Sequence, residues 1–291
     1  MNLTTDDTKK IFRPQNIDQL DDIINRTREK LTYVAGATDL MLQDEQWNSA
    51  EFLLDLTSVR ELNTIDFMQD KGILIGSALP VSQIITNSLV QKNFQILIEA
   101  CRQIGSVQIQ NRATLGGNIA NASPAGDSLP ALNVLDSELW IGPRKNGKFT
   151  KSKVSQVMTG AGQNNLKLNS YIATIFIPFQ KLEDQFWYFR KLGQRHTLAI
   201  SKLSLAVLGW KKDQRIEEIR ICAGSVSPLV KRAFRTEALL NHQILTENLI
   251  ESARDALIKE IQPITDIRST DTYRRLICGE ILREMLYDLM K

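Results

Sequence analysis

The residues best suited to bind a charged ligand form a run of small side chains from Ala113 to Asp127, ATLGGNIANASPAGD. The adjacent glycines Gly116 and Gly117 allow backbone conformations that other residues resist, and they leave room for a ligand to contact the main chain. Consecutive exposed amide N–H groups can form a concave nest for an anion such as a pyrophosphate. A Gly-Gly pair is also a common marker of a tight turn between strands. The run alone leaves both interpretations open.

A second segment of small residues, Tyr33 to Leu40 (YVAGATDL), follows a short apolar stretch earlier in the chain. An apolar strand that ends in small residues is typical of a strand-to-loop junction where backbone amides can meet phosphates. The segment is not the dinucleotide-binding pattern G-x-G-x-x-G, and no P-loop lysine follows it. The second segment therefore favours an anion site over a plain turn, in a fold other than the common nucleotide-binding ones.

Composition indicates a globular protein without a nucleic-acid or membrane role. The 36 basic and 33 acidic residues give a net charge of +3, and no dense Lys/Arg block occurs, so nucleic acid is not an expected partner. The first ten residues do not resemble a signal peptide. No apolar run approaches the roughly 20 residues of a membrane span. The length allows one large domain or two. We expect a cytoplasmic protein with no membrane span.

Metal-binding residue types are scarce. The cysteines Cys101, Cys222 and Cys278 lie far apart in apolar surroundings, no C-x-x-C pattern occurs, and the two histidines are His196 and His242. An iron–sulfur cluster or structural zinc held by this chain alone is therefore not expected. Each cysteine is predicted to be a small buried side chain in a reducing compartment.

Hydrophobic spacing predicts the elements that must position the two segments. Asn16, with Gln19 three residues later, predicts a capped helix, and a second helix is predicted from about Gln91 to Ile104. Strands are predicted at Thr32–Ala35, Phe52–Leu56, Ile73–Gly76, Leu139–Ile141, Tyr171–Ile177, Phe186–Lys191, Leu203–Trp210 and Ile216–Ala223. Asp213-Gln214 is the predicted hairpin turn between the last two.

Three helical patterns end the chain. The apolar stripe of the last one is predicted to pack on the core and consists of Tyr273, Leu276, Ile277, Ile281, Met285, Leu286 and Leu289. A change of composition between about Pro178 and Phe186 indicates a domain boundary.

The order of these motifs carries a resemblance to a known family. AGATDL (Ala35 to Leu40), TLGGNI (Thr114 to Ile119) and NASPAGD (Asn121 to Asp127) are followed by Gly224-Ser225-Val226-Ser227-Pro228, by Arg232, and by Asp266-Ile267-Arg268-Ser269 with Tyr273-Arg274. This series resembles the FAD-binding medium subunit of molybdenum hydroxylases, the xanthine dehydrogenase and carbon monoxide dehydrogenase family. The resemblance covers nearly the whole chain.

The resemblance implies an α+β fold. A two-lobed FAD-binding domain would occupy residues 1–179, and a C-terminal flavoprotein domain, a small antiparallel sheet with helices, would occupy residues 180–291. The FAD would lie extended between the lobes, with its pyrophosphate on amides of both glycine segments. Backbone amides can hold such an anion without the desolvation of a lysine. The implied cofactor-binding residues are Val34, Ala35, Gly36, Ala37, Thr38, Asp39, Leu40, Ile104, Gly105, Thr114, Leu115, Gly116, Gly117, Asn118, Asp127, Ile172 and Lys191.

The resemblance also implies individual roles. Asp127 would accept hydrogen bonds from a ribityl or ribose hydroxyl, and Ile104 and Gly105 would pass close to the isoalloxazine or adenine. Ile172 would form an apolar wall. Lys191 would place a positive charge near the flavin, where it would stabilise the reduced ring. A solvated surface lysine is the alternative, since Arg190 and Arg195 could serve instead.

The implied function is electron relay. FAD on this chain would take electrons from the iron–sulfur clusters of a partner and pass them to a soluble acceptor, with NAD as the expected one. The expected partners are a molybdopterin-binding large subunit and a two-iron-two-sulfur small subunit, in a heterotrimer. This chain would hold no metal and no acid–base catalyst.

Three positions depart from the family pattern. Ala37 stands where a second glycine is usual, Asn169-Ser170 replaces Asp-Glu, and Ala199 replaces a frequent Asp. Alanine at position 37 would cost about 1 kcal/mol if the loop needs positive φ. Two alternatives therefore stay open: a flavin-free assembly subunit, and a standalone FAD reductase of the wider two-lobed family.

Overall fold

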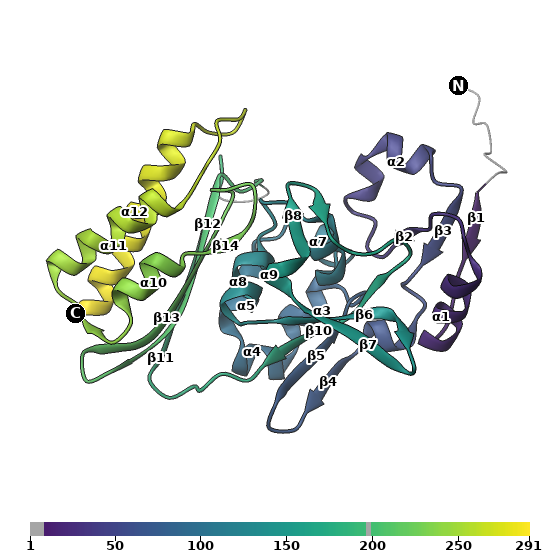
Figure 1. The fold of residues 1–291 in the computed structure, drawn as a ribbon, viewed down its shortest axis with the longest axis horizontal. Helices are drawn as coiled ribbons and strands as arrows, with labels where there is room; N and C mark the ends of the chain where they lie inside the picture. Colours follow the sequence, from purple (N-terminus) through teal and green to yellow (C-terminus); the bar gives the residue numbers. More distant parts are fainter. Residues whose placement is uncertain (1–8, 196–198) are drawn as a thin grey trace.

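The computed structural model describes residues 9–195 and 199–291. Residues 1–8 and His196, to which the sequence interpretation also referred, lie outside the described residues. The chain runs through a small parallel sheet, a larger antiparallel sheet wrapped by short helices, and a C-terminal sheet covered by longer helices (Figure 1). This is the predicted α+β class.

The first sheet has the order β1-β3-β2 and is parallel. Its strands are β1 (Lys10–Phe12), β2 (Thr32–Val34) and β3 (Phe52–Asp55), accompanied by α1 (Ile17–Arg26), the 3₁₀ turn η1 (Leu40–Leu42) and α2 (Asp44–Asn48). Asn16 caps α1 as predicted, because its side chain accepts from the Gln19 amide. The Gln19 side chain bonds the amide of Gln15, one residue before the cap, so the predicted capping box is shifted by one.

The second sheet has the order β4-β5-β10-β6-β7 and is antiparallel. Its strands are β4 (Ile65–Met68), β5 (Gly72–Gly76), β6 (Glu138–Lys145), β7 (Lys148–Lys153) and β10 (Tyr171–Pro178). The short elements around it are η2 (Arg60–Asn63), α3 (Val81–Thr86), α4 (Ser88–Asn93), α5 (Gln95–Arg102), α6 (Val107–Gln110), α7 (Leu115–Asn121), α8 (Ser128–Val134), α9 (Val154–Val157), β8 (Met158–Gly160) and β9 (Gln163–Asn164).

A buried polar cluster joins the two sheets. The Tyr171 hydroxyl donates to Asp21 Oδ1 at 2.7 Å, and Arg144 Nε donates to Asp21 Oδ2 at 2.6 Å and also pairs with Asp18. Asp21 lies on α1, whereas Arg144 and Tyr171 lie on β6 and β10, so the cluster fixes α1 against the second sheet. Because its charges are paired and hydrogen-bonded, their burial is compensated.

The C-terminal sheet has the order β11-β12-β13-β14, with β15 beside β13, and is antiparallel. Its strands are β11 (Gln185–Leu192), β12 (Leu203–Lys212), β13 (Arg215–Gly224), β14 (Lys231–Arg232) and β15 (Gln243–Ile244), followed by α10 (Phe234–Leu240), α11 (Glu247–Glu260) and α12 (Asp271–Met290). Asp213 and Gln214 form the predicted hairpin turn, both at positive φ, as tight β-hairpins prefer.

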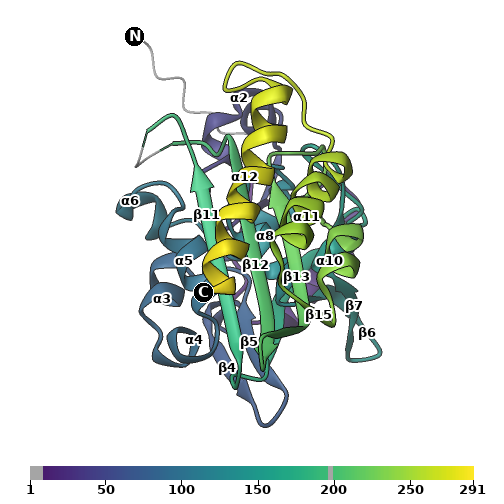
Figure 2. The same cartoon turned by 90° about the vertical axis from the view of Figure 1, so that its left-hand side faces the viewer.

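The C-terminal sheet is buried on both faces. Figure 1 shows β11, β12 and β13 standing between α10–α12 on one side and α5 and α8 on the other. Phe189, Ala206 and Cys222 join the core that contains α5 and α8, whereas Leu205 and Ile221 join the core under α11 and α12. Figure 2 looks onto the helical side. The sheet therefore links the helices at the chain end to the glycine-rich region.

Two predictions about helices need correction. The helix predicted from Gln91 to Ile104 is broken between α4 and α5, because Phe94 leaves the helical region (φ −137°, ψ 52°) to stack its ring on Phe179. In α12, Tyr273 and Leu276 are 41% and 47% exposed, so the predicted core stripe fails at its first two members. Ile281, Met285 and Leu286 are buried, and Ile277 and Leu289 are partly buried against the same core. Arg274 and Cys278 are buried in the same turns, so Tyr273 and Leu276 lie on the exposed side of the start of α12.

Candidate functional site

The two glycine segments meet through their backbones. A Cβ added to Gly36 would lie 2.0 Å from the carbonyl oxygen of Arg112 and 2.9 Å from Cα of Ala113. No real Cβ tolerates such distances, so only glycine lets the loop after β2 touch the chain entering Thr114. The structure thus brings together segments that the sequence could only propose as partners.

The first segment presents free amides. Within the described residues, no hydrogen bond uses the amide N–H groups of Gly36, Ala37, Thr38 or Asp39 as donor. Ala37 has φ +58°, and alternation of left-handed and right-handed residues turns successive amides toward one point. All four residues remain partly or fully exposed. Unused amides next to a left-handed residue are two features of an anion nest.

The left-handed Ala37 is strained, as the sequence comparison with a Gly-Gly loop anticipated. We expect Ala37→Gly to raise the free energy of unfolding by about 0.5–1 kcal/mol, because glycine adopts this φ without a Cβ clash. Urea unfolding of the two proteins without added ligand measures the difference. Gly162→Ala places an alanine at φ +67° in open space. This variant should lower the free energy of unfolding by a similar amount.

The second segment begins a helix. Thr114 caps α7, and its Oγ1 accepts from the Gly117 amide at 3.0 Å. The interpretation of Gly116-Gly117 as a turn between strands is therefore wrong. Gly116 packs against Ser77, whose Cβ would be 2.5 Å from an added Cβ, whereas Gly117 is exposed and its added Cβ would meet only Thr114 Oγ1 at 3.1 Å. Gly116 serves packing, and Gly117 leaves the helix start open to a ligand.

A buried ion pair lies at the other end of the run. Lys191 Nζ lies 2.6 Å from Asp127 Oδ2, and both side chains are 9% exposed. Lys191 is therefore not a solvated surface lysine. Its neighbour Arg190 faces the other side of β11 and pairs with Glu284. Asp127 comes from the start of α8 and Lys191 from β11, so the pair joins α8 to the C-terminal sheet.

Only one of the two carboxylate oxygens of Asp127 has a hydrogen-bond partner within the described residues. Its Oδ1 is buried and has no hydrogen-bond partner among the described residues. Burial raises the pKa of Asp127 from 3.8 to about 6, against the opposing effect of Lys191. The thiol of Cys101 nearby is also buried, which together with Asp127 raises its pKa to about 12 and makes it unreactive. The free oxygen is a natural acceptor for a ligand hydroxyl.

The segment before the glycine run contacts the Lys191–Asp127 pair through Gln103. Lys191 Nζ also donates to the carbonyl of Gln103 at 2.8 Å, next to Ile104, which is half-buried, and Gly105, which is exposed at φ +50°. Asn118 connects α7 to the start of α8, because its Oδ1 accepts from Ser128 Oγ at 2.6 Å. Asp127, Lys191 and the Gln103 carbonyl therefore form one cluster, and Ile104 and Gly105 follow Gln103 directly in the chain.

The remaining predicted residues frame the two clusters. Val34 ends β2 and Leu40 begins η1, so both flank the free amides. Leu115 is the first residue of α7, and its side chain is buried. Ile172 is 5% exposed on β10 and belongs to the main core, which α7 covers. Sequence reasoning missed Ser77 and the Gln103 carbonyl, and backbone contacts of this kind leave no signal in residue type.

Two residues that depart from the family pattern, Asn169 and Ala199, make contacts within the fold. Asn169 has φ +54° and accepts from the Leu31 amide while donating to the Glu29 carbonyl, so it ties the second sheet to the start of β2. Ala199 lies against Gly193, where an added Cβ would be 2.5 Å away. Neither residue contacts the glycine segments through a hydrogen bond within the described residues.

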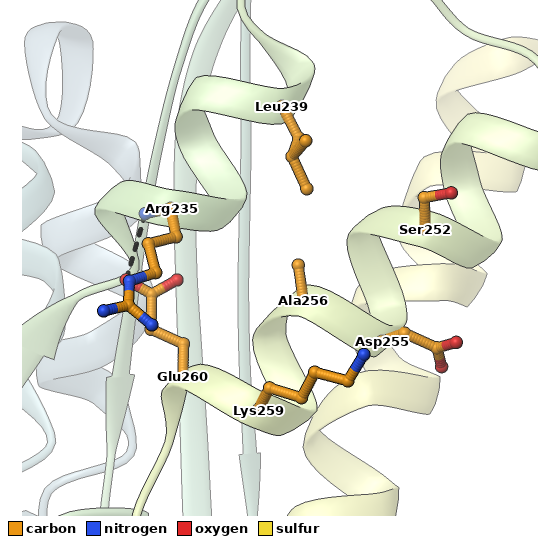
Figure 3. Close-up of a pocket in the computed structure, with 7 residues that line it drawn as sticks. All are labelled: Arg235, Leu239, Ser252, Asp255, Ala256, Lys259 and Glu260. Atoms are coloured by element: carbon orange, nitrogen blue, oxygen red, sulfur yellow. Dashed lines mark hydrogen bonds between the residues drawn. The ribbon is translucent and has the colours of Figure 1, made fainter.

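Grooves elsewhere do not compete with this site. A groove of about 400 Å³ lies between α10 and α11 (Figure 3). Of its two carboxylates, Glu260 accepts from the Arg235 amide and Asp255 pairs with Arg254. A second groove, of about 310 Å³, lies beside β3 near Phe52. In the described residues, no group of three or more His, Cys, Asp or Glu is placed to hold a metal ion, and no helix has the length and apolarity to cross a membrane.

Comparison with known proteins identifies the family. Residues 6–180 match "FAD binding domain in molybdopterin dehydrogenase", and residues 187–289 match "CO dehydrogenase flavoprotein C-terminal domain". The chain is 25% identical over 242 residues to the xanthine dehydrogenase FAD-binding subunit of Escherichia coli O157:H7, covering 83% of this chain and 82% of that protein. It is 24% identical over 276 residues to the carbon monoxide dehydrogenase medium chain of Hydrogenophaga pseudoflava, covering 94% of each.

Solved structures share the fold. A carbon monoxide dehydrogenase from Hydrogenophaga pseudoflava superimposes with a TM-score of 0.87 at 22% identity, over 95% of both chains. Quinoline 2-oxidoreductase from Pseudomonas putida 86 gives 0.87 at 18% identity, over 97% of this chain and 96% of that one. The fold, the order of the domains and the family matches agree, and the chain therefore belongs to the FAD-binding medium subunits of the molybdenum hydroxylases, of the xanthine and carbon monoxide dehydrogenase type.

Proposed function

We propose that the two glycine segments hold the pyrophosphate of FAD. The observation that carries this proposal is the meeting of Gly36 with the Arg112 carbonyl, which places four free amides beside the exposed start of α7. The Gly116 and Gly117 amides of α7 already donate to Ser77 O and Thr114 Oγ1, so the donors that remain for the anion are the amides of the first segment. Thr38 offers a hydroxyl next to these amides, whereas the Thr114 hydroxyl already accepts from Gly117.

The second cluster is proposed to hold the sugar and flavin end. The unpaired Asp127 Oδ1 would accept from a ribityl or ribose hydroxyl, Ile104 and Gly105 would contact a ring, and Ile172 would support the apolar side from within the core. Bound FAD supplies the electron-transfer chemistry. Lys191 holds a fixed positive charge between Asp127 and the Gln103 carbonyl, a position from which it can stabilise developing negative charge.

Within an assembled enzyme, this chain is proposed to relay electrons. The partners would be a molybdopterin-binding large subunit and a two-iron-two-sulfur small subunit, in a cytoplasmic heterotrimer, and NAD would be the acceptor. The proposed domains are residues 1–179 and 180–291. The relatives' names, a FAD-binding subunit and a medium chain, support a place in a multi-subunit enzyme, and the two adjoining family matches support the division into two domains.

The acceptor is tested on the isolated FAD-loaded chain. If NAD is the acceptor, the reverse reaction should occur, and anaerobic NADH should bleach the flavin absorbance. Dithionite is the control that shows the flavin to be reducible. Bleaching by dithionite with no response to NADH would contradict NAD as the acceptor and leave FAD binding unaffected.

The pyrophosphate site predicts a selective effect of Gly117→Val. The added side chain would enter the open space over α7, so FAD affinity should fall by about a hundredfold. The free energy of unfolding of the ligand-free protein should change by less than about 0.5 kcal/mol, because the position is exposed. Fluorescence titration with FAD and urea unfolding measure the two quantities.

Gly117→Ala provides a graded control. Its single methyl group would meet only Thr114 Oγ1, so its affinity should lie between those of the wild type and the valine variant. Equal FAD affinity in all three proteins would rule out a ligand at the start of α7.

The flavin-free assembly subunit remains the second candidate. Ala37 and Ala199 motivate it, because they stand where the family pattern has a glycine and a frequent Asp. Retention of FAD by the purified chain would eliminate this candidate.

A further inference from the structure

The motif Gly224 to Pro228 lies against the loop that leads to Asp127. The Ser225 amide donates to the Pro124 carbonyl at 2.8 Å. An added Cβ on Gly224 would meet Pro130 Cγ at 3.1 Å and Pro124 O at 3.4 Å, so the end of β13 and the loop are in close contact. None of the assigned cofactor contacts involves this motif.

Ser225 is held in a conformation that it does not prefer. Its φ is +60°, and it is 6% exposed. A serine stays in the left-handed region only when its surroundings fix it there. Here the amide is bonded to Pro124, the hydroxyl donates to the Ser201 carbonyl at 3.2 Å, and the carbonyl accepts from Arg274 Nη1 at 3.0 Å. All three hydrogen-bonding groups of the residue are thus used.

Arg274 is the buried support behind Ser225. It is 3% exposed, and its Nη2 pairs with Asp266 Oδ1 at 2.6 Å. Hydrogen bonds from Arg274, Arg268 and Ser269 lower the pKa of Asp266 to about 2, although its partial burial opposes this. The pair therefore stays charged at physiological pH. An arginine that bonds two separate acceptors through the fixed fork of its guanidinium gives directional support that lysine cannot fully reproduce.

The sheet holds the same loop at a second point. Lys191, Ser204 and Gly224 lie opposite one another on β11, β12 and β13. Lys191 forms an ion pair with Asp127. Ser225, which follows Gly224, donates its amide hydrogen to the Pro124 carbonyl. One row of the C-terminal sheet therefore fixes both ends of the segment Pro124 to Asp127, and helix α12 braces that row through Arg274.

We infer that Arg274 and Ser225 are positioning residues for the cofactor site: Arg274 fixes Ser225, and Ser225 sets the Pro124–Asp127 loop whose carboxylate faces the ligand. This inference rests on the proposal that Asp127 contacts FAD. It gives the C-terminal motif Asp266 to Arg274 a role in cofactor affinity from a distance, although none of its residues is proposed to contact FAD.

The test compares Arg274→Gln and Arg274→Lys with the wild type in the full chain. Hydrogen–deuterium exchange of the ligand-free protein reports on the amides of Ala125, Gly126 and Asp127, and fluorescence titration reports FAD affinity. Arg274→Gln should speed exchange in this loop and weaken FAD binding by about tenfold. Arg274→Lys, which keeps one charged donor, should restore part of both properties.

Arg275→Gln is the matched control. Arg275 is the next residue of α12 and donates to the carbonyls of Ile258 and Ile261, without contact to Ser225. It should lower the unfolding temperature and leave loop exchange and FAD affinity unchanged.

Three results would overturn the inference: unchanged loop exchange in folded Arg274→Gln, equal effects of the Arg274 and Arg275 variants, or faster exchange with unchanged FAD affinity. A wild-type chain that binds no FAD would instead refute the proposed function, and the exchange data would still decide whether Arg274 fixes the loop.

Discussion

Gly36→Ala is expected to abolish stable FAD binding. The methyl group would overlap the Arg112 carbonyl oxygen at 2.0 Å, and a backbone atom cannot turn aside as a flexible side chain can. The two glycine segments would have to separate, which would cost stability of about 1–3 kcal/mol. It would also pull the free amides away from α7, so affinity should fall by at least about a hundredfold.

Dialysis of the FAD-loaded variant followed by absorbance of the retained flavin measures this effect. Gly147→Ala is the control, because Gly147 lies in the β6–β7 turn at φ +73° with open space around it. That variant should lose stability and keep its flavin. A folded Gly36→Ala protein with wild-type FAD affinity would show that the two segments need not touch.

Lys191→Met is the second change with a large expected effect. It would leave the buried Asp127 carboxylate without its cation, and breaking a buried pair in this way costs about 3–5 kcal/mol. The exposed pair Lys181–Glu183 provides the control, since Lys181→Met should cost less than about 1 kcal/mol. Asp127→Asn combined with Lys191→Met should recover much of the loss, because the uncompensated charge is gone.

The pH dependence follows from the raised pKa of Asp127. In the folded protein this pKa is about 6, against an ordinary 3.8, so folding favours the protonated carboxyl. The contribution of Asp127 is therefore greatest below about pH 4 and is lost as the pH rises through 6. Lys191→Met raises this pKa further.

Urea unfolding at pH 5 and pH 8 measures the consequence. The deficit of Lys191→Met relative to the wild type should be smaller at pH 5, where its Asp127 is protonated, than at pH 8. An equal deficit at both values would mean that Asp127 and Lys191 are not energetically coupled.

Residue type located the glycine segments but did not reveal how they meet. The glycines at positions 36 and 116 indicated points of close approach. The groups that they approach, the Arg112 carbonyl for Gly36 and Ser77 for Gly116, depend on the packing of separate elements. The Lys191–Asp127 pair joins residues that lie far apart in sequence, and a lysine at the surface of a strand gives the same local pattern. Only the family resemblance suggested its role.

Local propensity also hid one element of the site. Helix α7 contains two glycines in seven residues, each of which disfavours a helix by about 1 kcal/mol relative to alanine. Thr114 supplied the capping signal, but a helix this short forms through its tertiary contacts, here with Ser77 and β10. The longer strands and α12 were predicted because their apolar patterns extend over many residues.

The most direct measurement is the visible absorption spectrum of the purified chain, followed by denaturation and identification of the released chromophore. We predict flavin absorption bands and the release of FAD, and we predict that the bands disappear after dialysis of Gly36→Ala. A colourless folded protein that takes up no added FAD would contradict the proposed site and would favour the flavin-free assembly subunit.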